Sequence, residues 1–453
     1  MKKIIIYSFL AFTILGTSCK KVLEQIPGDA QPGEEVLKSS ANVNAVLAAA
    51  YERFASNDFM GGLVVKTSEL YGDQIDFVNV TGGAEVQFKQ RGFSTFNGLG
   101  RSLWFTGYEA IGRANVVLKA FAENTYADLT PATKDSWRGE ALFIRGVSHF
   151  ELTRLFAKPF TNNPTADPGI VVRQKALSAN EAQVAVQRNT VRESYDAAIA
   201  DLKQAETLLP AVNGGVKATR WSAKAYLARI YFNMGDYINA NLYANDVLVN
   251  SGYSLGTSVL TPFQSNTVIT APVTGVVQML AGDAGTLKGT FWSGDLNNTY
   301  LPLGATLASA ISSRGGTRSS LLTANSTTPV RTISLKWAFQ TQNTPIIRLA
   351  EMRLIRAEAT VQNNTFTDAN VRADVNAIRA VAGVAADNTT TGAAALLTLI
   401  RNERAVEMFT EGDGYHELRR LKLNVRGIPY NDASGLLKIP DGEVRANLGM
   451  IQN

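Results

Sequence analysis

Three glutamates near the C-terminal end have the spacing that most plainly suggests chemistry. Glu403, Glu407 and Glu411 recur at every fourth position in the segment LIRNERAVEMFTEGDGYHELRRLK. On an α-helix this spacing places all three carboxylates along one face. Aligned carboxylates can serve general acid–base catalysis or hold a metal ion. One hypothesis is therefore a surface hydrolase that uses this face.

A structural charge network is the alternative, and we favour it. A helix that binds two metal ions through carboxylates would carry Glu-x-x-His, which is absent here, and a glycosidase needs a second carboxylate across a cleft. Glu403, Arg404 and Glu407 can instead pair with one another and with arginines of adjoining helices, with Gly412 as the helix C-cap. In the segment PIIRLAEMRLIRAEA, Arg348 and Glu351 are spaced to pair at i, i+3.

Other signatures of catalysis or cofactor binding are missing from the sequence. The two histidines, His149 and His416, lie in no metal-ligand spacing, and they are expected to be packing or helix-surface residues. There is no nucleophile elbow, phosphate loop or dinucleotide fingerprint. We therefore expect no metal, no cofactor and no catalytic residue. A net charge of +5 on 453 residues also gives no bulk basic field for nucleic acid.

The single cysteine, Cys19, ends a segment typical of a lipoprotein export signal. Lys2 and Lys3 precede an apolar stretch, and Leu-Gly-Thr-Ser-Cys has the small residues of a lipobox. We expect Cys19 to be lipidated and to become the mature N-terminus. The alternative is a plain signal peptide with a chance cysteine. No later stretch approaches the about 18 apolar residues of a membrane helix.

Helical periodicity dominates two parts of the chain and predicts the elements that position these residues. Apolar residues recur at helical spacing from residue 41 to 252, and again at 345–361, 368–381 and 393–409. One helical pair resembles a tetratricopeptide unit through small and aromatic residues at its packing positions, namely Leu227, Ala228, Tyr231, Gly235, Ala240 and Ala244. Residues 257–342 are rich in Thr, Ser, Gly and Asn, which predicts loops and short strands rather than helices.

Several long motifs, in order, resemble the SusD/RagB family of Bacteroidota outer-membrane lipoproteins. They are the lipobox with KKVLEQIP, LWFTGYEAIGRANVVL, RGEALFIRGVSHFELTRLFAKP, VRESYDAAIADLKQAETLLP, the hairpin of residues 223–248, RLAEMRLIRAEA, IRNERAVEMFTEGDGYHELRRLK and LLKIPDGEVRANLGMIQN. The resemblance implies a mainly α, tetratricopeptide-like scaffold with a long irregular insertion and no catalysis. It also implies a SusC-like TonB-dependent transporter as partner, over which the lipoprotein acts as a lid that delivers a glycan or, in some members, peptides.

These observations predict a lipid-anchored nutrient-binding protein of the outer membrane that faces the cell surface. The expected regions are a signal peptide (1–18), a lipidated tether (19–40), an N-terminal helical region (41–256), a loop-rich ligand-binding segment (257–345) and a C-terminal helical region with its tail (346–453). Sugars pack on aromatic rings and pair through hydroxyls with polar side chains. The candidate ligand-binding residues are therefore aromatic and polar residues of the irregular regions: Asp73, Gln74, Phe77, Trp292, Asn297 and Tyr300.

Two other functions remain open at this point. A tetratricopeptide-type adaptor would bind a protein segment and no small ligand. The hydrolase would use the face of Glu403, Glu407 and Glu411.

Overall fold

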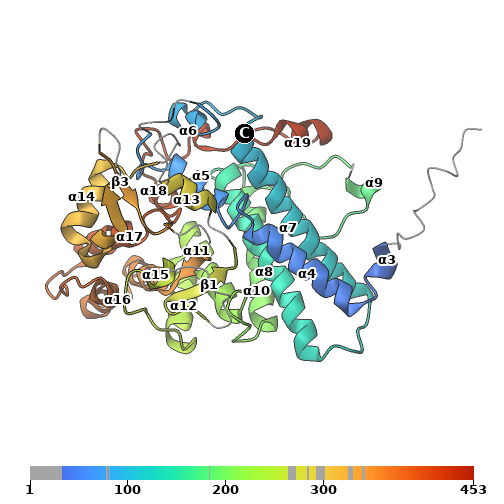
Figure 1. The fold of residues 1–453 in the computed structure, drawn as a ribbon, viewed down its shortest axis with the longest axis horizontal. Helices are drawn as coiled ribbons and strands as arrows, with labels where there is room; N and C mark the ends of the chain where they lie inside the picture. The colour runs from blue at the N-terminus through green and yellow to red at the C-terminus, as the bar shows by residue number, and fades with distance from the viewer. Residues whose placement is uncertain are drawn as a thin grey trace, which may run out of the picture.

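A computed structural model describes residues 33–77, 80, 82–182, 184–263, 272–282, 285–291, 301–324, 330–338 and 342–453. The chain is mainly α-helical, as predicted, with a few short strands (Figure 1). Cys19, Trp292, Asn297 and Tyr300 lie outside the described residues. Among the described residues, no helix is both long enough and apolar enough to cross a membrane.

Long helices lie side by side in the N-terminal half, where the sequence predicted them (Figure 1). They are α4 (Ser40–Ala55), α7 (Gly98–Glu123), α8 (Pro131–Phe156) and α10 (Val191–Leu208), and the one-turn helices α3 (Gly33–Val36) and α9 (Ala179–Ala182) lie outside them. The start of α10 follows from local chemistry, because Thr190 and Glu193 form a capping box. Glycines at the crossings, such as Gly107 between α7 and α8, let the backbones approach closely.

The tetratricopeptide-like hairpin forms at the predicted place. It consists of α11 (Arg220–Met234) and α12 (Tyr237–Asn250), joined at Gly235, which takes the left-handed conformation with φ of 78°. Ala240 and Ala244 are fully buried on α12, so the two helices meet at short distance. Two shorter helices, α5 (Leu63–Tyr71) and α6 (Val86–Gln90), flank a loop that carries three of the candidate ligand residues.

The segment expected to hold only loops and short strands contains helices as well, so that prediction was wrong in part. Its described elements are η1 (Thr261–Phe263), β1 (Val276–Leu280), α13 (Gly285–Phe291), α14 (Ala305–Arg314), η2 (Gly316–Leu321), β2 (Leu322–Ala324) and β3 (Thr332–Ser334). Helix α14 forms because Leu307, Ala308 and Ile311 share one buried face. Thr306, Ser309, Ser312 and Ser313, which lie around these residues, hide this short apolar pattern in the sequence.

The C-terminal region holds α15 (Leu349–Gln362), α16 (Asp368–Val381), α17 (Ala393–Glu407), α18 (Gly414–Arg420), η3 (Ala433–Gly435) and α19 (Asp441–Ala446). The helix expected from Pro345 begins only at Leu349. The preceding residues form strand β4 (Thr344–Arg348), which is fully buried and pairs antiparallel with β1. Helix α17 ends at Glu407 with Met408 as its C-cap, so the expected C-cap at Gly412 was wrong.

One large hydrophobic core joins both halves of the chain. It contains buried residues from Val43 on α4 to Met450 in the tail. Two smaller clusters lie under α15–α17 and around α14. Since α11 and β4 both contribute to the large core, the C-terminal region is packed onto the N-terminal helices.

Candidate functional site

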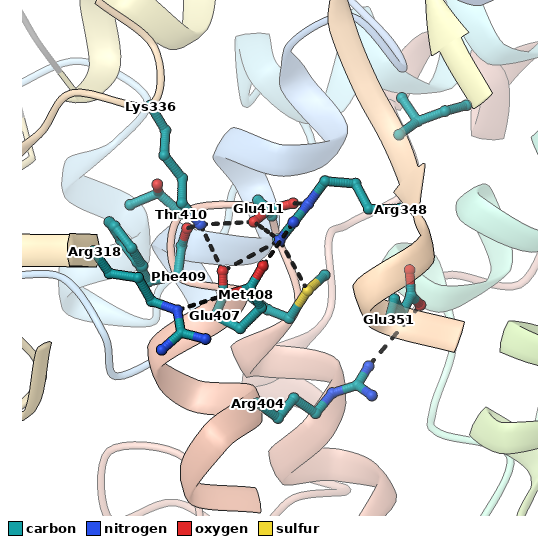
Figure 2. A network of polar contacts seen from close by, with 12 residues as sticks. Arg318, Lys336, Arg348, Glu351, Arg404, Glu407, Met408, Phe409, Thr410 and Glu411 are labelled. Atoms are coloured by element: carbon teal, nitrogen blue, oxygen red, sulfur yellow. Dashed lines mark hydrogen bonds and ion pairs between the residues drawn. The ribbon is translucent and has the colours of Figure 1, made fainter. Parts of the chain in front are cut away.

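The three glutamates converge on three buried cations. Figure 2 shows two of these glutamates, Glu407 and Glu411, with their partners. We call this set the carboxylate network: Arg318, Lys336, Arg348, Glu403, Glu407 and Glu411. Arg318 donates to Glu403 at 2.6 Å and to Glu407 at 2.7 Å. Arg348 donates to the other oxygen of Glu407 at 2.7 Å.

Glu411 joins the network although it lies beyond the helix. Because α17 ends at Glu407, the three carboxylates do not share one helix face as the spacing predicted. The turn after α17 brings Glu411 back, and both of its oxygens accept from Arg348 at 2.7 Å. Lys336 donates to Glu411 at 2.7 Å and to the backbone carbonyls of Glu407 and Phe409. The three carboxylates thus meet because of tertiary packing and not because of the helical repeat.

The electrostatics of the network favour fixed charges. Burial alone would raise the pKa of Glu407, but Arg348, Arg318 and Lys336 outweigh it and lower that pKa to about 2. Burial lowers the pKa of Lys336 to about 8, although Glu411 and Glu407 oppose the shift. A general acid or base needs a pKa near the working pH and access to its substrate. Glu407 has neither property, because it is 9% exposed and both of its oxygens are bonded to arginines.

The other two residues expected in the network make ion pairs elsewhere. Arg404 faces away from Glu407 and donates to Asp413 at 2.6 and 2.8 Å. Glu351 accepts from Arg229 at 2.6 and 2.8 Å, so the expected pair between Arg348 and Glu351 was wrong. The physical reason is that Arg348 lies on strand β4 and Glu351 on helix α15, so the i, i+3 relation of a helix does not hold between them.

A small internal cavity adjoins these ion pairs. Its volume is about 40 Å³, and residues of the network line it together with apolar side chains such as Met60, Val64 and Trp337. This space fits about three water molecules. The cavity is therefore too small for a sugar ring.

The loop between α5 and α6 offers open polar groups. Asp73 is exposed and Gln74 is half-buried. The side chain of Gln74 lies against Gly414, and its Oε1 is buried with no hydrogen-bond partner among the described residues. Phe77 is 7% exposed, and the guanidinium of Arg426 lies 4.5 Å from its ring centroid. The Phe77 ring therefore anchors the loop and presents no open face for stacking on a sugar.

The residues that follow the segment of the other candidates lie beside this loop. Residues 292–300 are not described, but the residues at their two ends are joined, since the Leu301 N–H donates to the Thr290 carbonyl at 2.7 Å. The chain then runs along the loop through an antiparallel bridge between Ile75 and Leu303 and a hydrogen bond from Asp76 to Pro302 at 2.8 Å. The described residues that follow this segment, from Leu301 to Leu303, therefore lie beside the loop of Asp73, and Thr290 before it is bonded to Leu301.

Several functional-site neighbours had no signal in the sequence. Arg318 and Lys336 lie in a Ser- and Thr-rich stretch with no periodicity, and the glutamate side chains that they bind are 75 to 89 residues away. Asp76 and Arg331 form an ion pair of 3.7 Å beside the Asp73 loop. None of these four residues was a candidate from the sequence, and their charge is the only signal that could have pointed to them.

Both histidines are buried, which agrees with a packing role. His149 Nε2 accepts from the Arg173 N–H at 3.2 Å, and burial lowers the pKa of His149 to about 3. His416 Nε2 lies 3.1 Å from the Ser68 hydroxyl. In the described part of the chain, no three His, Cys, Asp or Glu residues are grouped so that they could hold a metal ion.

The fold and this site define a helical scaffold protein with a network of buried ion pairs and an open polar loop. Two family profiles match the chain: one described as starch-binding and associating with the outer membrane, over residues 21–232, and one described as the SusD family, over residues 325–447. The chain belongs to the SusD/RagB family. The predicted family is thereby confirmed, and it is a family of carbohydrate-binding proteins associated with the outer membrane.

Curated relatives cover part of the chain. It is 26% identical over 254 residues to SusD-like protein P2 of Formosa agariphila, a match that covers 55% of this chain and 47% of the relative. It is 25% identical over 166 residues to a SusD-like protein of Bacteroides ovatus, covering 34% and 28%. The chain therefore spans about half or less of the length of these relatives.

Solved structures share the whole fold. A SusD superfamily protein from Bacteroides thetaiotaomicron superposes with a TM-score of 0.79 at 20% identity, covering 91% of this chain and 99% of that chain. A SusD-like carbohydrate binding protein from Bacteroides vulgatus gives 0.75 at 17% identity, covering 90% and 97%. These likenesses establish the tetratricopeptide-like helical fold.

Proposed function

We propose that this protein is a non-catalytic, lipid-anchored nutrient-binding subunit that captures a glycan, or in the second place a peptide, for a TonB-dependent transporter of the outer membrane. The observation that carries the proposal is the pairing of the glutamates that most resembled catalytic groups. Glu403, Glu407 and Glu411 all accept from buried cations. Because these carboxylates are bonded to buried cations in this member of a carbohydrate-binding family, we favour binding of the ligand without cleavage.

The ligand site in this proposal is the surface around the loop between α5 and α6. Asp73, Asp76 and Arg331 there provide exposed or half-exposed charged groups for sugar hydroxyls. Trp292 and Tyr300 belong to the segment that leads into residues 301–303 beside this loop, so they are the aromatic candidates. Asn297 is the polar candidate of the same segment.

Attachment and partnership complete the proposal. A lipidated Cys19 and its tether would hold the body at the outer membrane, on the cell surface, within reach of a SusC-like transporter. The support is the lipobox sequence and membership of an outer-membrane-associated family.

Ligand binding is tested with the mature protein and a panel of oligosaccharides, using calorimetry and thermal shift. Maltoheptaose heads the panel because the matched family is described as starch-binding. A bound ligand at one hundred times its Kd should stabilise the fold by about 2.7 kcal/mol. Replacing Trp292 and Tyr300 together by alanine should abolish binding, and Asp73→Ala should weaken it about tenfold, as expected for the loss of a hydrogen bond to a charged group.

The control is Asp58→Ala, which removes an exposed loop aspartate that precedes α5. It should leave affinity unchanged. The proposal fails if no glycan or peptide in the panel stabilises the protein. The placement of the site fails if the double alanine variant binds as tightly as the wild type.

A further inference from the structure

A polar groove lies on the helical scaffold, away from the loop of Asp73. It occupies about 450 Å³ between α12, α15 and α16. In the view of Figure 1 these helices lie below α5 and α6. The residues that line it are mostly small or polar: Asn241, Asn245, Arg356, Thr360, Asn370, Ala373 and Asp374. The groove is thus a separate surface that the proposed glycan site does not use.

Side-chain amides in the groove are open to a ligand. Asn241 and Asn245 are one helical turn apart on α12, and Asn370 faces them from α16. The amides of Asn241 and Asn370 make no hydrogen bond to another described residue. Asn245 accepts from Arg356 at 2.9 Å, which leaves its NH₂ group unused within the described part of the chain. Each amide both donates and accepts, so the groove matches a ligand that alternates donors and acceptors.

The floor of the groove carries one uncompensated positive charge. Asp374 is 4% exposed and accepts from both Arg356, at 2.8 Å, and Arg353, at 2.9 Å. Two guanidinium groups therefore share one carboxylate. The Nε of Arg353 is also buried without a partner among the described residues. An anionic group entering the groove would complement this charge.

The rim next to the amides is aliphatic. Ile238, Leu242 and Val249 are 71%, 59% and 63% exposed. At about 100° per residue they fall on one face of α12, beside Asn245. No aromatic residue lines the groove, and sugar rings stack on aromatic faces rather than on aliphatic side chains. This composition favours the side chains of a peptide over a sugar.

The spacing of the amides also fits a peptide backbone. Four residues along a helix advance about 6 Å, and an extended peptide repeats every two residues at about 6.6 Å. We propose that this groove binds an extended peptide segment that carries one acidic side chain. Asn241, Asn245 and Asn370 pair with its backbone, its carboxylate meets Arg356, and its apolar side chains lie on the rim of α12.

The test uses the mature wild-type protein and a displayed library of random dodecapeptides. Selection should enrich peptides with one Asp or Glu among Val, Ile, Leu or Thr. Selected peptides are then synthesised, labelled with fluorescein and measured by anisotropy. Their Kd should rise at least tenfold in the double variant Asn241→Ala/Asn245→Ala. Ala373→Glu places a negative charge at an exposed position of the groove, where it should repel the acidic side chain of the peptide. This variant should also raise the Kd at least tenfold.

The matched control is Asn250→Ala, which removes an exposed asparagine from the same helix on the side away from the groove. It should change Kd less than twofold. Thermal unfolding of each variant checks that it is folded. The proposal is overturned if no peptide is enriched, if enriched peptides bind the groove variants as well as the wild type, or if maltoheptaose displaces them, which would make the groove a sugar site.

Discussion

Charged side chains in the interior of this protein are held in place by one another. In the carboxylate network, Arg318, Lys336 and Arg348 are each less than 5% exposed. A buried ion pair costs desolvation, which its mutual attraction and its hydrogen bonds must offset. Removing one partner leaves the other as an unpaired buried charge, and the protein then loses much of its stability. The network therefore acts as a set of mutually dependent contacts between α17, β4 and η2.

At the residue scale we predict that Glu407→Gln destabilises the protein by about 3 to 5 kcal/mol, because Arg318 and Arg348 both lose their shared anion. The pKa of Glu407 is lowered to about 2, so its contribution to stability is present above its ordinary pKa of 4.5 and is lost as the pH falls through 2. Urea unfolding at pH 7, 5 and 4 should therefore show a gap between wild type and variant that narrows below pH 4.5.

The control for this prediction is Glu123→Gln, which breaks an exposed pair with Lys119 and should cost less than about 0.5 kcal/mol. A Glu407→Gln protein as stable as the wild type would contradict the structural role. If that protein also lost the turnover of a polysaccharide that the wild type cleaves, the hydrolase hypothesis would be favoured instead.

Helix α8 shows how the scaffold controls its spacing. Gly139 and Gly146, seven residues apart, both face α10. A Cβ on Gly146 would lie 3.0 Å from the Asp201 Cβ and 3.1 Å from the Ala198 carbonyl oxygen. Next to it, Arg145 donates to Asp201 at 2.8 Å and is nearly buried. The absence of a side chain at Gly146 thus permits both the close helix contact and the ion pair.

At the element scale we predict opposite effects for two glycine substitutions. Gly146→Ala should destabilise by about 1 to 3 kcal/mol, since α8 and α10 must separate. Gly112→Ala, on the exposed face of α7 with no atom within 4 Å, should stabilise by up to about 1 kcal/mol through helix propensity. Chemical denaturation of both variants under the same conditions measures the change in the free energy of unfolding that each substitution causes. If both substitutions changed the stability by the same amount in the same direction, the close approach of α8 and α10 would not depend on the glycine.

The whole molecule combines a rigid helical body with a proposed anchor at its N-terminus. Its core joins residues from both ends of the described chain, so the body should move as one unit on its tether. One acyl chain gives marginal membrane binding at about 0.8 kcal/mol per buried CH₂, whereas several chains on one cysteine hold permanently. Anchorage by Cys19 would keep the ligand surface near the membrane without restricting the orientation of the body.

At this scale we predict that Cys19→Ser releases the protein from the membrane fraction. Ser18→Ala, which keeps a small residue before the cysteine, should leave it attached. Fractionation followed by immunoblotting measures both.

After mild detergent extraction the wild type should co-purify with a β-barrel transporter, across an interface larger than about 1,600 Å². A Cys19→Ser protein that stays membrane-bound by itself, or a wild type that co-purifies with no such barrel, would contradict the proposed anchor and partner.

Local patterns in the sequence determined the helices. A helix forms its backbone hydrogen bonds within one segment, and apolar residues recur every three to four positions on its buried face. The small residues of the α11–α12 hairpin were readable for this reason. The same rule failed at Pro345, where apolar residues that fit a helix instead form a strand buried against β1.

The sites depended on tertiary structure. Glu403, Glu407 and Glu411 were found from their spacing, but their partners Arg318, Lys336 and Arg348 are 59 to 89 residues away, and no local pattern records such a distance. Asp73 was identified as a polar loop residue, whereas only packing showed that Phe77 is covered by Arg426. The groove between α12, α15 and α16 could not be read from the sequence at all, because its walls come from three helices whose relative placement only the packed core decides.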